Sequence, residues 1–82
     1  MPQWIVYSRP DCSLCDQLLE DLAQMLSPAE AAQLQVVDIS QDPQIERKYA
    51  LRIPVLTADG DFVCAYRLDA ERVRAIRESA GL

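Results

Sequence analysis

The sequence predicts an α/β domain of the order β-α-β-α-β-β-α, with a mixed four-stranded sheet and helices on both faces. Three observations predict it. First, a β-rich apolar run, Trp4–Tyr7, precedes a helical apolar pattern. Second, another β-rich run, Leu34–Ile39, follows that pattern. Third, Val55–Tyr66 contains two β-rich runs joined through Asp-Gly. Strand, helix and strand in succession imply a right-handed parallel crossover. Asp-Gly favours a two-residue hairpin turn, so the last two strands should be antiparallel.

The elements of the first half follow from the spacing of apolar residues. Trp4–Tyr7 is a continuous apolar run of the kind buried in a parallel sheet, so it should be a central strand. From Cys15 onward a helix is predicted that ends near residues 27–32, with one apolar face formed by Leu18, Leu19, Leu22, Met25 and Leu26. The second strand, Leu34–Ile39, comes next.

Capping residues mark the two remaining helices. Asp42 can cap a short helix in which Pro43 takes the first position, and Asp69 can cap a last helix that runs to about Ser79. The apolar residues expected to point inward are Ile45 and Tyr49 in the short helix and Leu68, Val73 and Ile76 around the last one.

Length and charge limit the class of protein. A chain of 82 residues that is 50% hydrophobic should form a single domain over residues 1–82 with an apolar core. Eight basic and 13 acidic residues give a net charge of −5, which argues against a general affinity for nucleic acid or anionic membrane. No apolar run approaches the roughly 20 residues of a membrane span, and the first residues lack a signal peptide's pattern. We therefore expect a cytoplasmic monomer.

Two of the three cysteines, Cys12 and Cys15, stand where an irregular segment becomes the first helix. In a reducing cytosol such a pair is more often catalytic or metal-binding than a structural staple. Unpaired backbone N–H groups and the helix dipole favour the thiolate of Cys12, and Arg9 adds a positive charge nearby. Cys15 lies one turn further, on the apolar face. Cys12 should therefore attack a disulfide, and Cys15 should resolve the mixed disulfide.

Other interpretations of the cysteines stay open. Cys15 alone would also suit an ordinary small core residue. A structural zinc site needs four ligands, whereas this chain has no histidine and only Cys64 to add, so no metal ligand is assigned. If the cysteines bind metal instead, the expected form is a metal cluster whose ligands come from two chains. Cys64 itself is expected to be a buried strand residue rather than a third redox partner.

The C-x-x-C motif at the first strand-helix junction and the Ile53-Pro54 pair before the hairpin resemble the thioredoxin fold in its glutaredoxin-like form. The resemblance covers nearly the whole chain. It implies that Pro54 is cis and packs beside the cysteines, which leaves the backbone of Ile53 free to pair with an extended substrate. The alternative is a trans proline that merely starts an edge strand.

The segment Tyr-Ser-Arg-Pro-Asp-Cys is similar to the Tyr-Ser-Lys-Pro-x-Cys segment of glutaredoxins. This resemblance puts Arg9 at the basic position that meets a glutathione carboxylate, and it puts Tyr7 at the border of the site. Arg52 has two interpretations, a solvated surface residue or a residue that faces substrate. Arg9, Ile53, Pro54, Arg52 and Tyr7 are thus the expected substrate-binding residues.

The sequence also departs from glutaredoxins. Ser13 and Leu14 replace the common Pro-Tyr pair, and the Gly-Gly that receives glutathione's γ-glutamyl end is missing, its place falling near Cys64 and Ala65. The resemblance implies a thiol-disulfide oxidoreductase of cell redox homeostasis acting on protein or small-molecule disulfides. No tightly bound cofactor is expected, and glutathione is a candidate co-substrate. The alternatives are a thioredoxin-like protein reductant fed by a reductase, and a non-enzymatic module that binds a metal or partner through the cysteines.

Overall fold

Four strands form one mixed sheet in the order β2-β1-β3-β4. The computed structural model describes residues 1–82, and its strands are β1 (Trp4–Ser8), β2 (Gln35–Asp38), β3 (Val55–Ala58) and β4 (Asp61–Ala65). β1 pairs parallel with β2 and antiparallel with β3, and β3 pairs antiparallel with β4. The predicted sheet is confirmed, with β1 as a central strand.

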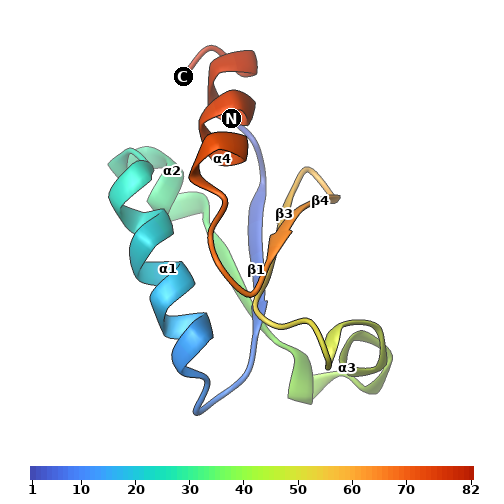
Figure 1. Cartoon of the computed structure of the whole chain (residues 1–82). Coiled ribbons are helices and arrows are strands. Elements are labelled where there is room, and N and C mark those ends of the chain that lie inside the picture. The colour runs from blue at the N-terminus through green and yellow to red at the C-terminus, as the bar shows by residue number, and fades with distance from the viewer.

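The helices cover both faces of this sheet. They are α1 (Ser13–Met25), α2 (Pro28–Gln33), α3 (Pro43–Tyr49) and α4 (Ala70–Ser79). α1 and α3 lie on opposite sides of the strands (Figure 1). α1 and α4 share one face, because Leu18 and Leu22 of α1 and Val73 of α4 belong to the same buried cluster. The α/β class with helices on both faces is therefore confirmed.

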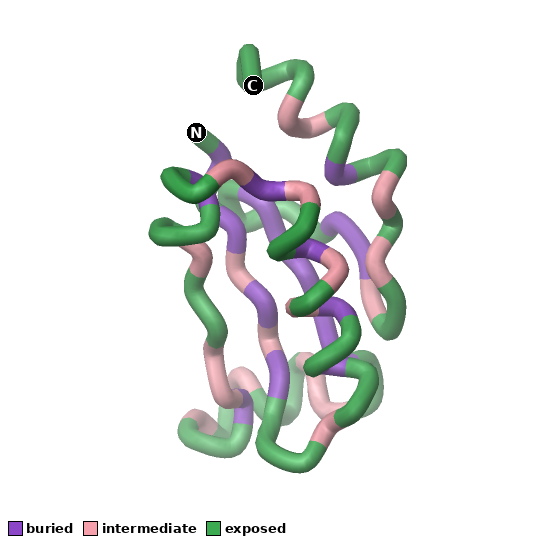
Figure 2. The backbone as a smooth tube through the Cα atoms, turned by 90° about the vertical axis from the view of Figure 1, so that its left-hand side faces the viewer, coloured by how far each residue is buried: buried purple, intermediate pink, exposed green.

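The main core lies between the sheet and the helices α1 and α4. Residues of β1 alternate between buried and half-buried, as a strand with two covered faces requires (Figure 2). The largest side chains buried in this core are Trp4, Leu18, Leu22 and Leu56. A second, smaller cluster contains Cys15, Ile39 and Ile53 and lies at the end of the sheet where α1 begins.

The segment after α1 departs from the sequence interpretation, which placed no separate helix there. Pro28 lacks a backbone N–H and starts a new helix, α2, at its first position. Ser27 caps α2 and forms a capping box with Glu30. Ile39, expected in the second strand, instead begins a 3₁₀ turn, Ile39–Gln41, because the Asp38 side chain accepts from the N–H of Ser40 at 2.9 Å.

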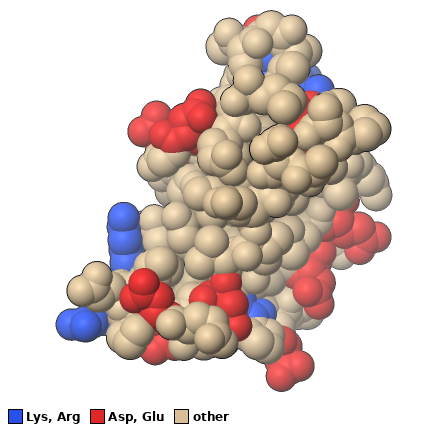
Figure 3. Space-filling view, turned by 180° about the vertical axis from the view of Figure 1, so that it is seen from behind, with Lys and Arg blue, Asp and Glu red and all other residues tan.

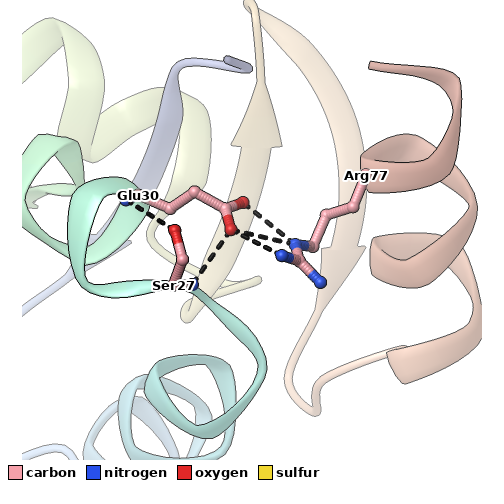
Figure 4. Close-up of polar contacts among 3 residues, drawn as sticks. All are labelled: Ser27, Glu30 and Arg77. Carbon is pink, nitrogen blue, oxygen red and sulfur yellow. Dashed lines mark hydrogen bonds and ion pairs between the residues drawn. The ribbon is translucent and has the colours of Figure 1, made fainter. Parts of the chain in front are cut away.

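A buried ion pair connects α2 to α4. Glu30 is 1% exposed, and one of its carboxylate oxygens lies 2.7 Å from Nη2 of Arg77 (Figure 4). Nε of Arg77 donates to the other oxygen at 3.0 Å, and the N–H of Ser27 donates to the first at 2.9 Å. These hydrogen bonds, those from Arg77 above all, outweigh burial and lower the pKa of Glu30 to about 2.

The predicted turn and caps are confirmed. Asp59 and Gly60 both have positive φ, 52° and 86°, as the two central residues of a primed hairpin turn require. Asp42 caps α3 by accepting from the N–H of Gln44, and Asp69 caps α4 by accepting from the N–H of Arg72. None of the helices is long and apolar enough to cross a membrane.

Candidate functional site: the cysteine pair at the start of α1

Cys12 and Cys15 are joined by a disulfide at the N-terminus of α1, with their Cα atoms 5.2 Å apart. Cys12 is the N-cap residue of α1 in an extended conformation, and its Sγ accepts the backbone N–H of Cys15 at 3.2 Å. An N-cap position gives an anion unpaired N–H groups and the positive end of the helix dipole. The reduced Cys12 would therefore have its thiolate stabilised by the helix.

The two cysteines differ in exposure, as the first turn of an amphipathic helix requires. Cys12 is half-buried, whereas Cys15 is 1% exposed. Cys15 packs in the smaller cluster with Ile39 and Ile53. An incoming disulfide can thus reach Cys12, while Cys15 is shielded from solvent behind it.

Ile53 and Pro54, which directly precede β3, lie close to the cysteine pair. The Ile53-Pro54 bond is cis, as expected, and Ile53 lies in the cluster that contains Cys15 and is flanked by Cys12. The backbone N–H and C=O of Ile53 take part in no hydrogen bond. The carbonyl of Pro54 is already used, because it accepts from the N–H of Tyr66 at 2.8 Å. The free backbone beside the cysteines is therefore that of Ile53.

The other three expected site residues lie in different surroundings. Tyr7 borders the cysteine cluster and stacks on Tyr49 of α3 with 4.4 Å between ring centroids. Burial, followed by the neighbouring Tyr49, raises the pKa of the Tyr7 phenol. Arg9 is exposed in the loop that leads into α1 and forms no ion pair. Arg52 lines a cavity on the α3 face of the sheet whose lining includes neither Cys12 nor Cys15.

The sequence interpretation missed Tyr66 as a residue of this site. Tyr66 has φ of 69°, an uncommon conformation for a bulky residue. Its hydroxyl donates to the carbonyl of Leu51 at 2.9 Å. Together with Arg67 it lines a cavity of about 480 Å³ whose other wall, from α1, includes Leu14. The only signal in the sequence was the position of Tyr66 next to the expected Gly-Gly place, which gave no indication of its conformation.

The third cysteine is separate from the pair. Cys64 lies in β4, is buried and belongs to the main core, so the expectation of a buried strand residue is confirmed. Burial raises the pKa of its thiol. No group of three or more His, Cys, Asp or Glu side chains in the structure is arranged so that it could hold a metal ion.

The fold and the C-x-x-C disulfide at the start of α1 define a thioredoxin-fold protein with a dithiol site. The chain matches the model of the family described as Glutaredoxin-like domain (DUF836) over residues 3–76. It belongs to this family. The comparison with curated proteins found no match.

Solved structures agree with this family. Protein Ne2328 from Nitrosomonas europaea is 30% identical with a TM-score of 0.76, and the match covers 92% of this chain and 89% of that one. Protein XcR50 from X. campestris is 38% identical with a TM-score of 0.71, over 93% and 96% of the two chains. Oxidized glutaredoxin 2 from Chlamydomonas reinhardtii is 19% identical with a TM-score of 0.59, over 95% and 74%, and it shows likeness of fold alone.

Proposed function

We propose that this protein is a cytoplasmic thiol-disulfide oxidoreductase in which Cys12 is the nucleophile and Cys15 the resolving thiol. One observation carries the proposal: Cys12 is half-buried and its Sγ accepts a backbone N–H at the start of α1, whereas Cys15 is almost fully buried. The dipole and the N–H groups stabilise a thiolate at Cys12 and do less for Cys15.

The exchange proceeds in two balanced steps. The Cys12 thiolate attacks one sulfur of a substrate disulfide, forms a mixed disulfide and expels the other substrate sulfur as a thiolate, which takes up a proton. Cys15 then loses its proton and attacks Sγ of Cys12. The second substrate thiol leaves, and the protein is left with the Cys12–Cys15 disulfide. An external thiol reductant, glutathione or a reductase dithiol, must supply two electrons to restore the pair.

Substrates of this mechanism are protein or small-molecule disulfides. The unpaired backbone groups of Ile53 support strand addition, in which an extended peptide pairs with the chain while its sulfur faces Cys12. The unpaired guanidinium of Arg9 supports attraction of a carboxylate on the substrate.

Alkylation kinetics test the activated nucleophile. Reduced Cys12 should react with iodoacetamide at neutral pH faster than a cysteine in an unstructured peptide, because the helix terminus and Arg9 favour its thiolate. Arg9→Gln should slow this reaction roughly two- to fivefold, the effect of removing one exposed charge near a helix end. Arg74→Gln, a matched change on the exposed side of α4, should leave the rate unchanged. A Cys12 that reacts like the peptide cysteine in every variant would refute the proposal.

Glutathione should bind at least about tenfold more weakly than it binds a glutaredoxin that keeps Gly-Gly. Cys64 and Ala65 each place a Cβ near the expected γ-glutamyl position, and the acidic partner is displaced to Asp69. Losing one or two hydrogen bonds to charged groups, at roughly 1.5–3 kcal/mol each, accounts for this factor. Calorimetry on a Cys12→Ser variant measures the affinity without covalent exchange. Affinity equal to that of the intact glutaredoxin would contradict this expectation.

Exposed apolar residues favour a second candidate function, a reductant dedicated to protein disulfides and fed by a reductase. Leu51 is 91% exposed, and its carbonyl accepts a hydrogen bond from the hydroxyl of Tyr66. Tyr66 and Leu14 both line the 480 Å³ cavity. Apolar side chains exposed beside a reactive site are typical of protein-binding surfaces. Undetectable glutathione binding, combined with efficient reduction by a thioredoxin reductase, would favour this candidate.

A further inference from the structure

A second cavity, of about 370 Å³, lies on the α3 face of the sheet and includes none of the cysteines. Lys48 and Tyr49 of α3 and Arg52 of the following loop form one wall. Thr57 of β3 and Phe62 of β4 line the side formed by the sheet. Its volume falls within the range of roughly 300–1,000 Å³ typical of small-molecule sites. Its lining contains two cations and no carboxylate.

An irregularity in the β3–β4 pairing shapes this cavity. Leu56 pairs with Cys64, but the next residue of β3, Thr57, pairs with Phe62, so Val63 is an extra residue in β4. Such a bulge re-aims the side chains beyond it. Val63 and Cys64 therefore both enter the core, and Phe62 comes to lie beside Thr57 on the α3 face, where it is 49% exposed.

The hydroxyl of Thr57 has no hydrogen-bond partner. Thr57 is 3% exposed, and its Oγ1 is buried without a hydrogen bond of ordinary geometry, although it lies close enough to the Tyr7 phenol on the adjacent strand to oppose the rise in the pKa of that group. Burying a hydroxyl unpaired is unfavourable, and valine has nearly the same shape without that group. Thr57 therefore leaves a hydroxyl that is incompletely hydrogen-bonded at the wall of the cavity, beside the Tyr7 phenol.

The two cations of the cavity also lack partners. The only ion pair in the structure joins Glu30 to Arg77. Nζ of Lys48 lies 5.2 Å from the centroid of the Tyr49 ring, and Nη2 of Arg52 reaches only the carbonyl of Lys48, at 3.4 Å. Viewed from behind, Lys and Arg side chains lie at the lower left, at the α3 end of the molecule, with acidic side chains next to them along the lower edge and further acidic side chains at the upper left and on the right (Figure 3). In a chain of net charge −5, two unpaired cations at one cavity attract an anion.

We propose that this cavity binds a small organic anion with a flat apolar body, such as an aromatic carboxylate. The body lies against Phe62 and Tyr49, the anionic group lies between Lys48 and Arg52, and the Thr57 hydroxyl donates a hydrogen bond to it. The redox activity of Cys12 and Cys15 is not needed for this binding, so the two proposals can fail separately.

Backbone amide NMR titration of the oxidised protein tests the proposal with 2-naphthoate as the probe and 2-naphthalenemethanol as its uncharged analogue. We expect saturable shifts confined to residues 48–62, with a Kd at or below about 1 mM. The uncharged analogue should bind at least about tenfold more weakly, because it cannot pair with the cations. Shifts scattered over the surface, or equal affinity for both compounds, would overturn the proposal.

Two variants separate a binding role from a structural one. Thr57→Val should weaken 2-naphthoate roughly three- to tenfold while raising the thermal midpoint by a few degrees, since an unpaired buried hydroxyl is removed. The double change Lys48→Gln and Arg52→Gln, both exposed, should weaken it at least about tenfold with no loss of folding. Arg67→Gln together with Arg74→Gln, the same charge change outside the cavity, is the control. If the control weakens binding as much, or neither variant does, the cavity is not the site.

Discussion

We expect Cys12→Ser to abolish disulfide exchange and Cys15→Ser to stop it at the mixed disulfide. Only Cys12 is both half-buried and at the N-cap position of α1, so its loss should remove the attacking thiolate altogether. A serine hydroxyl stays protonated at neutral pH, and we expect the exchange rate to fall at least about a thousandfold, toward background. Cys15→Ser keeps the nucleophile and removes the group that releases the substrate, so a stable mixed disulfide accumulates.

A peptide disulfide with a mass tag measures both outcomes. Mass spectrometry should find one peptide attached to Cys15→Ser, at position 12, and none attached to Cys12→Ser at the same time point. Cys64→Ser, with both active cysteines present, is the matched control and should turn over like the unchanged protein, since Cys64 is buried in the main core. Equal labelling of Cys12→Ser and Cys15→Ser would show that the assigned roles are wrong. The Cys15→Ser protein also serves to trap natural substrates from a lysate.

Local sequence patterns predicted most of the fold. The strands, the Asp59-Gly60 turn and the caps at Asp42 and Asp69 are each determined by a few neighbouring residues, and all were predictable. Part of the site could be predicted as well: the start of the first helix placed Cys12 and Cys15, and the resemblance to glutaredoxins placed Ile53 and Pro54 beside them.

The features that escaped prediction depend on contacts between distant residues or on local backbone detail. Glu30 and Arg77 are 47 positions apart, so no local pattern indicates that they meet. Helix α2 was missed although its start is marked locally. Ser27, Pro28 and Glu30 begin it as a capping box that is visible in the sequence. The extra residue in β4 was equally hidden, because alternation alone places Phe62 and Cys64 on one face of a regular strand, whereas the bulge separates them.

Arg77→Met should destabilise the protein by about 3 kcal/mol at neutral pH, because it leaves the Glu30 carboxylate buried without its cation. Methionine keeps an unbranched apolar side chain at this position of α4, so the loss comes chiefly from the ion pair. Adding Glu30→Gln to Arg77→Met should restore a large part of this loss, since the unpaired buried charge is then gone. Urea unfolding at pH 7 measures the three proteins. A double variant less stable than Arg77→Met would refute the explanation from an unpaired charge.

The Glu30–Arg77 pair also makes the stability of the protein depend on pH in the acidic range. The pKa of Glu30 in the folded protein, about 2, lies below its ordinary value of 4.5, because Arg77 and Ser27 donate to the carboxylate. A lowered folded-state pKa means that this stabilisation is fully present above about pH 4.5 and is lost as pH falls from there toward 2. The unchanged protein should therefore lose stability steeply across that window, whereas Glu30→Gln, which has no proton to gain, should show a shallower dependence while being less stable at pH 7. Asp16→Asn, at an exposed carboxyl of α1, is the matched control and should keep the steep dependence. Parallel pH profiles for Glu30→Gln and the unchanged protein would show that the Glu30–Arg77 pair does not connect α2 to α4 in solution.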